Sequence, residues 1–329
     1  MSRGFKFFFI ALILSLPFWL GINLFQENLE KFFYAQIGQP FEEMVFVKIP
    51  ERVQRPPLEL DVKSAISLKI SKTGRERIVF QKNPEEILPI ASLTKLMTAV
   101  IVLDYNPPTT HPTGSEVPQN YYLENTWITI SPEAANQKDV PVYGNLKAGE
   151  RFNLKQLLDL ALIYSSNDSA FALSEVIGVE NFVEKMNQTA RELKLENTNF
   201  VNPTGLDPEN LYYHLPNREY FNYSTAKDLV KLAQYILFNH PLIFEISLER
   251  GPYLVRNGLF DLSLPAPHQG LGGGFKLIGG KTGYTDEAGG CFLIVFQDEK
   301  ESFFFNLILG TKRENRVGEM QKLIDWLNI

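Results

Sequence analysis

Residues 89–104, PIASLTKLMTAVIVLD, are the stretch on which the fold depends. After Pro89 they predict a helix from Ser92 to Asp104, because no helix-breaking residue interrupts them. The apolar side chains lie nearly all round this helix, and a helix of that kind is buried on most of its faces. We therefore expect it to lie inside the domain, with other elements packed around it.

Strand-like segments lie on both sides of this helix along the chain. Residues 64–70 and 76–81 predict a hairpin with a polar turn at 72–75, and residues 276–285, 290–297 and 302–310 predict three later strands. Helices are predicted over 154–177 with a break at 165–168, over 180–194, from a cap at Ser224 to about Leu237, and at the C-terminal end. We expect an α+β fold, in which one antiparallel sheet takes strands from both ends of the domain and packs against helices.

The composition is that of an ordinary globular protein, with 329 residues, 44% hydrophobic and 21% charged. A net charge of −6 argues against nucleic acid as a partner. Cys291 is the one cysteine and the four histidines are scattered, so we expect no internal disulfide, no metal and no cofactor. Residues 105–125 are rich in proline, threonine and asparagine and predict a long loop.

Residues 7–25, FFFIALILSLPFWLGINLF, carry no charge and are long enough to span a bilayer as a helix. Arg3 and Lys6 precede them, which predicts that residues 1–6 stay in the cytoplasm and the rest of the chain is exported. A cleaved signal peptide is the alternative reading, although no small-residue cleavage site follows. We expect a juxtamembrane linker at 26–60 and one domain at 61–329, where length alone suggested roughly two.

Three short motifs carry chemistry, in the order Ser92-Leu93-Thr94-Lys95, Ser165-Ser166-Asn167 and Lys281-Thr282-Gly283. A serine and a lysine three residues apart share one helix face, so the amine reaches the hydroxyl and activates it as a nucleophile. The second motif offers a proton relay and an amide clamp. The third offers a cation and a hydroxyl for a carboxylate, and its glycine lets another backbone approach closely.

Two of these motifs occur a second time. Ser224-Thr225-Ala226-Lys227 repeats the first, and Lys72-Thr73-Gly74 repeats the third. We interpret Ser224 as a helix cap and Lys72–Gly74 as a hairpin turn. The order of the three motifs along the chain therefore selects Ser92, Ser165 and Lys281.

Together with longer runs such as 89–98, 197–207 and 280–289, these motifs resemble the serine-type D-alanyl-D-alanine carboxypeptidases, which are low-molecular-mass penicillin-binding proteins of β-lactamase/transpeptidase-like fold. The resemblance covers about residues 60–329. It implies an acyl-enzyme on Ser92, with Lys95 as general base and Ser165 as proton relay. It also implies that Asn167, Lys281, Thr282 and Gly283 bind substrate, and that the backbone N–H groups of Ser92 and Tyr284 form the oxyanion hole.

The implied partners are peptidoglycan stem peptides, with β-lactam antibiotics as covalent inhibitors that trap Ser92. Because peptidoglycan lies outside the membrane, the resemblance places the enzyme at the bacterial cytoplasmic membrane, with its catalytic domain on the outer side and residues 7–25 as tether. If that segment is cleaved, the protein is secreted or periplasmic.

Two other functions stay open within this reading. One is a D-alanyl-D-alanine endopeptidase that cuts peptidoglycan cross-links, for which the chemistry is identical and only the leaving amine differs. The other is a membrane-tethered, non-catalytic module that binds peptidoglycan or senses β-lactams, which the intact motifs disfavour. A P-loop is excluded because Phe275 stands where its first glycine belongs.

Overall fold

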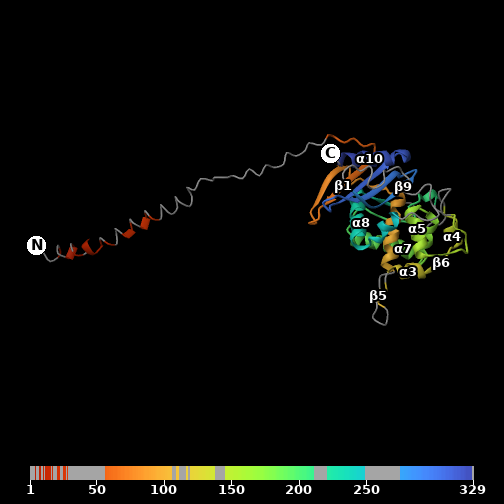
Figure 1. Ribbon diagram of the computed structural model, residues 1–329, viewed down its shortest axis with the longest axis horizontal. Coiled ribbons are helices and arrows are strands. Elements are labelled where there is room, and N and C mark those ends of the chain that lie inside the picture. Colours follow the sequence, from red (N-terminus) through yellow and green to blue (C-terminus); the bar gives the residue numbers. More distant parts are fainter. Residues whose placement is uncertain are drawn as a thin grey trace. The chain divides into compact units, whose positions relative to one another are not determined.

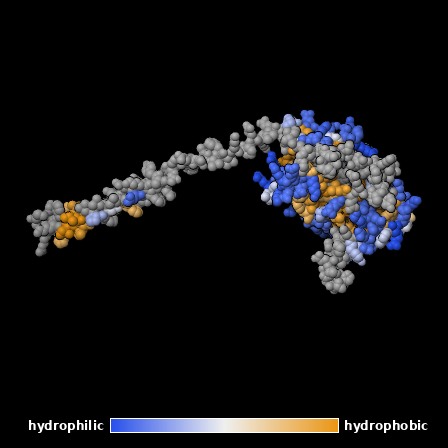
Figure 2. Space-filling view, in the orientation of Figure 1, coloured by the Kyte–Doolittle hydropathy of each residue, from blue (hydrophilic) through white to orange (hydrophobic). Residues whose placement is uncertain are grey.

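The computed structural model describes scattered positions between 4 and 28, and residues 56–105, 109–110, 116–117, 119–137, 145–210, 221–248 and 275–327. The chain divides into two units, Met1–Pro56 and Pro57–Ile329 (Figure 1). In the first unit, large apolar side chains such as Phe7 and Leu14 are exposed (Figure 2). Among the described residues, no helix is both long enough and apolar enough to cross a membrane. Much of the predicted 7–25 span and residues 29–55 of the predicted linker lie outside the described residues.

A five-stranded antiparallel sheet forms the frame of the second unit. Its strands are β1 (Ser64–Ile70), β2 (Glu76–Lys82), β9 (Lys276–Thr285), β10 (Gly289–Gln297) and β11 (Phe303–Thr311), in the order β2-β1-β11-β10-β9. Because β1 pairs with β11, the first hairpin of the domain joins its last three strands, with Ser67 opposite Asn306. The predicted sheet with strands from both ends is confirmed.

Helices lie on both sides of this sheet. The described helices are α2 (Thr94–Tyr105), α3 (Gln119–Asn125), α4 (Pro132–Ala135), α5 (Leu154–Ile163), α6 (Asn167–Ser174), α7 (Val179–Glu192), α8 (Ala226–Asn239), α9 (Leu242–Leu248) and α10 (Arg316–Leu327). Along β11, Phe304 and Ile308 pack with α10, whereas Phe305 and Leu307 belong to the core shared with the other helices. Alternate side chains of one strand point to opposite faces, so α10 lies on one face and the helices of the larger core lie on the other (Figure 1).

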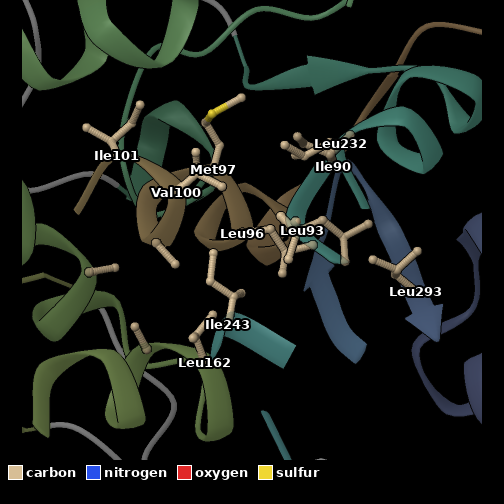
Figure 3. Close-up of a cluster of buried hydrophobic side chains, with 14 of the residues drawn as sticks. Ile90, Leu93, Leu96, Met97, Val100, Ile101, Leu162, Leu232, Ile243 and Leu293 are labelled. Atoms are coloured by element: carbon tan, nitrogen blue, oxygen red, sulfur yellow. The ribbon is translucent and has the colours of Figure 1, made fainter. Parts of the chain in front are cut away.

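Helix α2 lies at the centre of the larger core, as the sequence predicted. Residues 94–103 are all buried, and Leu96, Met97 and Val100 are at most 1% exposed. Figure 3 shows these side chains among those of Leu162, Leu232, Ile243 and Leu293, which come from α5, α8, α9 and β10. Because so many elements contact it, α2 fixes the position of whatever precedes it in the chain.

Three local predictions were wrong. The helix begins at Thr94, and Ser92 lies in a separate 3₁₀ turn, η1 (Ala91–Leu93). Thr225, whose side chain accepts a hydrogen bond from Asp228 N–H, caps α8 in place of Ser224. The predicted 105–125 loop contains helix α3, and short strands also form within it.

The strands within that loop are β4 (Thr109–Thr110) and β5 (Glu116–Val117), which pair with each other. Two more small pairs lie elsewhere: β3 (Leu88–Pro89) with β8 (Tyr223–Ser224), and β6 (Trp127–Thr129) with β7 (Arg151–Asn153). Two further 3₁₀ turns, η2 (Pro208–Asn210) and η3 (Arg313–Asn315), complete the described elements.

Candidate active site

The predicted nucleophile and base lie in hydrogen-bond contact. Lys95 Nζ is 3.0 Å from Ser92 Oγ. Ser92 is half-buried in η1, and Lys95, in the first turn of α2, is 0% exposed. Ala91 just before the serine has φ +46°, a conformation that a residue with a side chain seldom adopts. The turn therefore places the Ser92 hydroxyl above the buried amine.

Two further acceptors hold the lysine. Lys95 Nζ donates to Asn167 Oδ1 at 2.6 Å and to the Thr204 carbonyl at 2.7 Å. Asn167 is the first residue of α6, whose N-terminus Ser166 caps by accepting from Ser169 N–H. The structure thus brings the first two motifs together. The contact from Thr204, which lies in the loop after α7, was not predicted.

The second and third motifs also meet. Lys281 Nζ, from β9, donates to Ser165 Oγ at 2.8 Å and to the Thr282 carbonyl at 2.9 Å. Ser165 has φ +62° in the break between α5 and α6, which aims its hydroxyl at β9. Burial lowers the pKa of Lys281 well below that of an ordinary lysine, and the charges of Lys95 and Arg316 lower it further.

Strand β9 passes very close to the nucleophile at Gly283. A Cβ atom on this residue would lie 3.1 Å from Ser92 N and 3.2 Å from Ala91 Cβ, tighter than side-chain atoms normally allow. The glycine therefore lets β9 run beside the serine without displacing the turn that carries it. Thr282 is 9% exposed, and the hydroxyl of Tyr284 donates to Asp286. Among the described strands, β9 lies at one edge of the sheet.

Arg316, at the start of α10, is a residue that the sequence analysis missed. Its Nη1 donates to the Gly283 carbonyl at 3.5 Å. Burial lowers its pKa, and the nearby charge of Arg313 lowers it further. Arg316 therefore adds a second basic group to the Lys281 of the Lys-Thr-Gly motif, and the pair is a suitable environment for an anionic group. In the described part of the chain, no cluster of side chains fit to bind a metal occurs.

The repeated motifs lie elsewhere and have structural roles. Lys227 Nζ pairs with Glu85 at 2.7 Å, and Ser224 Oγ lies 2.7 Å from Thr198 Oγ1. Lys72–Gly74 forms the turn between β1 and β2, with Gly74 at φ +79°. Cys291 is buried in β10.

Comparison with known proteins gives the same family. A sequence profile described as D-alanyl-D-alanine carboxypeptidase, peptidase S11, matches residues 50–303, more than half of the chain. The chain is 28% identical over 257 residues to a D-alanyl-D-alanine endopeptidase of Pseudomonas aeruginosa, covering 72% of this chain and 68% of the relative. It is 30% identical over 233 residues to the D-alanyl-D-alanine carboxypeptidase DacF of Bacillus subtilis, covering 70% of this chain and 53% of the relative.

Solved structures share the fold. The cefotaxime-bound penicillin-binding protein D2 of Listeria monocytogenes superposes with a TM-score of 0.62 at 25% identity, over 82% of this chain and 98% of that one. Penicillin binding protein 6B of Escherichia coli gives 0.61 at 25% identity, over 83% and 80%.

Proposed function

The chain belongs to the D-alanyl-D-alanine carboxypeptidase family, and from this premise we propose that it removes the terminal D-alanine of peptidoglycan stem pentapeptides through an acyl-enzyme on Ser92. It is a serine-type hydrolase of the penicillin-binding protein class. The observation that carries the mechanism is the 3.0 Å contact between Lys95 Nζ and Ser92 Oγ. A serine hydroxyl is a weak nucleophile and needs such a base beside it.

Acylation begins when Ser92 Oγ attacks the carbonyl carbon of the penultimate D-alanine. Lys95, in its unprotonated form, accepts the hydroxyl proton as the new C–O bond forms. The negative charge that develops on the carbonyl oxygen is stabilised by the backbone N–H groups of Ser92 and Tyr284. The close approach of β9 at Gly283 supports this assignment, because it brings the two residues to one site.

The intermediate then collapses and the peptide C–N bond breaks. The departing D-alanine amine takes the proton that Lys95 accepted, relayed through Ser165, whose Oγ lies 2.8 Å from Lys281 Nζ. Lys281 and Thr282 bind the terminal carboxylate, and we add Arg316 as a second cation for it. Asn167, already bonded to Lys95, holds the substrate amide.

Water completes the cycle by hydrolysing the ester on Ser92, which releases the shortened stem peptide. A β-lactam carries both a reactive carbonyl and a carboxylate, so it enters the same site and stays bound as an ester. A relative of this fold is known in the cefotaxime-bound form, which supports this assignment.

We also place this enzyme at the cytoplasmic membrane, with residues 1–6 inside, 7–25 as a transmembrane tether, 26–60 as spacer and 61–329 as the outer catalytic domain. The apolar length of 7–25 and the cations before it support the arrangement. N-terminal sequencing of the protein from washed membranes tests it. An intact N-terminus supports the tether, and a mature chain that begins beyond residue 25 contradicts it.

Covalent labelling with a fluorescent penicillin tests the chemistry. We expect the full-length chain in membranes to be labelled, and Ser92→Ala to abolish the label because it removes the hydroxyl that lies 3.0 Å from Lys95 Nζ and forms the ester. Ser224→Ala, which changes the serine of the repeated motif, is the matched control and keeps the label. Labelling of the Ser92→Ala variant would show that Ser92 is not the nucleophile.

Endopeptidase activity is the second candidate, favoured by the Pseudomonas aeruginosa relative of that name. Cleavage of a D-alanyl cross-link uses the same acyl-enzyme and differs only in the leaving amine. A pentapeptide muropeptide and a cross-linked dimer separate the two. Release of D-alanine from the pentapeptide alone supports the carboxypeptidase, and conversion of the dimer to monomers supports the endopeptidase.

A further inference from the structure

Two buried asparagines that the mechanism above does not use lie behind the catalytic lysine. Asn202 belongs to the loop between α7 and η2, and Asn222 directly precedes β8. They are 4% and 3% exposed. A buried amide is retained only where its donors and acceptors are satisfied, so the hydrogen bonds of these two side chains show what they hold in place.

Asn222 connects this loop to the helix that carries the base. Its Oδ1 accepts from the backbone N–H groups of Val201 at 2.7 Å and Asn202 at 3.1 Å. Its Nδ2 donates to the Asn202 carbonyl at 2.9 Å and to Thr94 Oγ1 at 2.9 Å. Since Thr94 precedes Lys95 in the chain, one amide fixes the distance between the loop and the first turn of α2.

Asn202 in turn folds the loop back on itself. Its Oδ1 accepts from the backbone N–H groups of Thr204 at 3.0 Å and Gly205 at 2.7 Å. This turn directs two successive carbonyls at α2. The Pro203 carbonyl accepts from Thr98 Oγ1 at 2.7 Å, and the Thr204 carbonyl accepts from Lys95 Nζ at 2.7 Å. The position of the Thr204 carbonyl therefore follows from the asparagine pair.

That carbonyl matters because an unprotonated amine has two N–H bonds and one lone pair. When the N–H bonds of Lys95 point to Asn167 Oδ1 and to the Thr204 carbonyl, the lone pair is left facing Ser92 Oγ. If the Thr204 carbonyl moves, the amine rotates and the lone pair turns away from the proton that it must accept. Orientation of this kind affects the rate of acylation more than the binding of substrate.

We infer that Asn222, acting with Asn202, is a positioning residue that orients the Lys95 amine toward Ser92 through the Thr204 carbonyl. The inference rests on the proposed acyl-enzyme mechanism. It predicts slower proton transfer, and hence slower acylation, when the Asn222 amide is removed. The lost contacts are ordinary hydrogen bonds, so the expected decrease is about tenfold.

The time course of labelling by a fluorescent penicillin measures this, because the rate reports acylation and the end point reports the fraction of folded sites. We expect Asn222→Ala to label about tenfold more slowly and to reach the wild-type end point. Asn187→Ala is the matched control. Its amide also joins backbone groups, the Val183 and Phe200 carbonyls, but outside the turn that faces Lys95. We expect this control to keep the wild-type rate.

A merely structural role gives the opposite result, a lower end point with an unchanged rate for the sites that remain. Thr94→Val is the second variant, because it keeps the side-chain shape and removes only the acceptor for Asn222; we expect labelling about threefold slower. Wild-type rates in both Asn222→Ala and Thr94→Val would overturn the inference. Labelling that no longer depends on Ser92 would instead overturn the proposed function, so the two failures are distinguishable.

Discussion

Lys281 Nζ lies 2.8 Å from Ser165 Oγ, so the lysine of the last motif contacts the serine of the second across 116 residues of sequence. Lys281 is 0% exposed. Burial lowers its pKa, and the charges of Lys95 and Arg316 act in the same direction. The site thus disfavours the charged form of Lys281, and the carboxylate of an incoming substrate supplies the negative charge that favours it.

The affinity for the substrate carboxylate will therefore fall as the pH rises, and it will fall at a lower pH than it would if Lys281 had the pKa of an ordinary lysine. Only the protonated Lys281 attracts the carboxylate, and its lowered pKa means that the proton is lost below about pH 10.4. The KM for a D-alanyl-D-alanine peptide, measured against pH, should rise on the alkaline side. The same peptide with a C-terminal amide is the control. An identical rise for the amide would show that Lys281 is not responsible.

Replacing Lys281 by methionine should stabilise the fold while reducing activity. Because the folded-state pKa is lowered, the unfolded chain binds more protons, and stability rises with pH up to the ordinary lysine pKa. Lys281→Met removes this penalty, which we expect to raise the free energy of unfolding by about 1 kcal/mol at neutral pH. The gain should shrink as the pH rises toward the ordinary lysine pKa of about 10.4, and vanish above it. Thermal unfolding across pH measures it, and a lower melting temperature at pH 7 would contradict the prediction.

Lys95→Ala and Lys227→Ala should differ sharply, although both lysines follow a serine by three residues. Lys95 is buried against Ser92 Oγ, whereas Lys227 is half exposed and paired with Glu85. Loss of a general base typically costs about 10²–10⁴ in rate, so labelling by penicillin should nearly vanish in the first variant. The second should label as wild type does, because an exposed ion pair contributes little. Equal labelling of the two variants would show that Lys95 is not the general base.

These residues show which parts of the site a sequence can give. Ser92 and Lys95 are only three residues apart in the sequence, so their contact could be predicted from that spacing. The Thr204 carbonyl and Arg316 come from 109 and 33 residues away from their partners, and backbone carbonyls leave no trace in residue type. The fold was predictable for a related reason. The five strands and the buried helix each have a strong apolar pattern. Strands from both ends of the domain must pair so that these apolar side chains are buried.

Two of the wrong predictions concern the ends or the presence of a helix. Ser224 and Thr225 are both good cap residues, and the choice between them depends on β8, in which Ser224 pairs with Leu88 of β3. Helix α3 was missed because its sequence, QNYYLEN, has little apolar periodicity. In both places tertiary contacts determined a boundary that residue preferences left open.

Gly205→Ala should be far more damaging than Gly74→Ala, although the two glycines have nearly the same φ, +83° and +79°. A Cβ on Gly205 would lie 2.0 Å from the Ala91 carbonyl oxygen, whereas none of the described atoms lies within 4 Å at Gly74. Backbone strain alone costs about 1–2 kcal/mol at either position. At Gly205 the clash adds about 1–3 kcal/mol and pushes on the residue before Ser92. Chemical denaturation and the labelling rate together measure this, and equal losses of stability would contradict it.

The Cys291 thiol should be inert in the folded protein. It is buried in β10 opposite Gly283, and burial raises its pKa to about 12. At pH 8 only about one thiol in 10,000 is then the reactive thiolate, before access is considered. We expect iodoacetamide to leave the native protein unmodified and to alkylate one site once denaturant is added. Penicillin labelling after native treatment is the control for the active site, which should stay fully active. Rapid alkylation without denaturant would mean that β10 opens readily, and that the edge of the sheet carrying Lys281 is less rigid than its packing indicates.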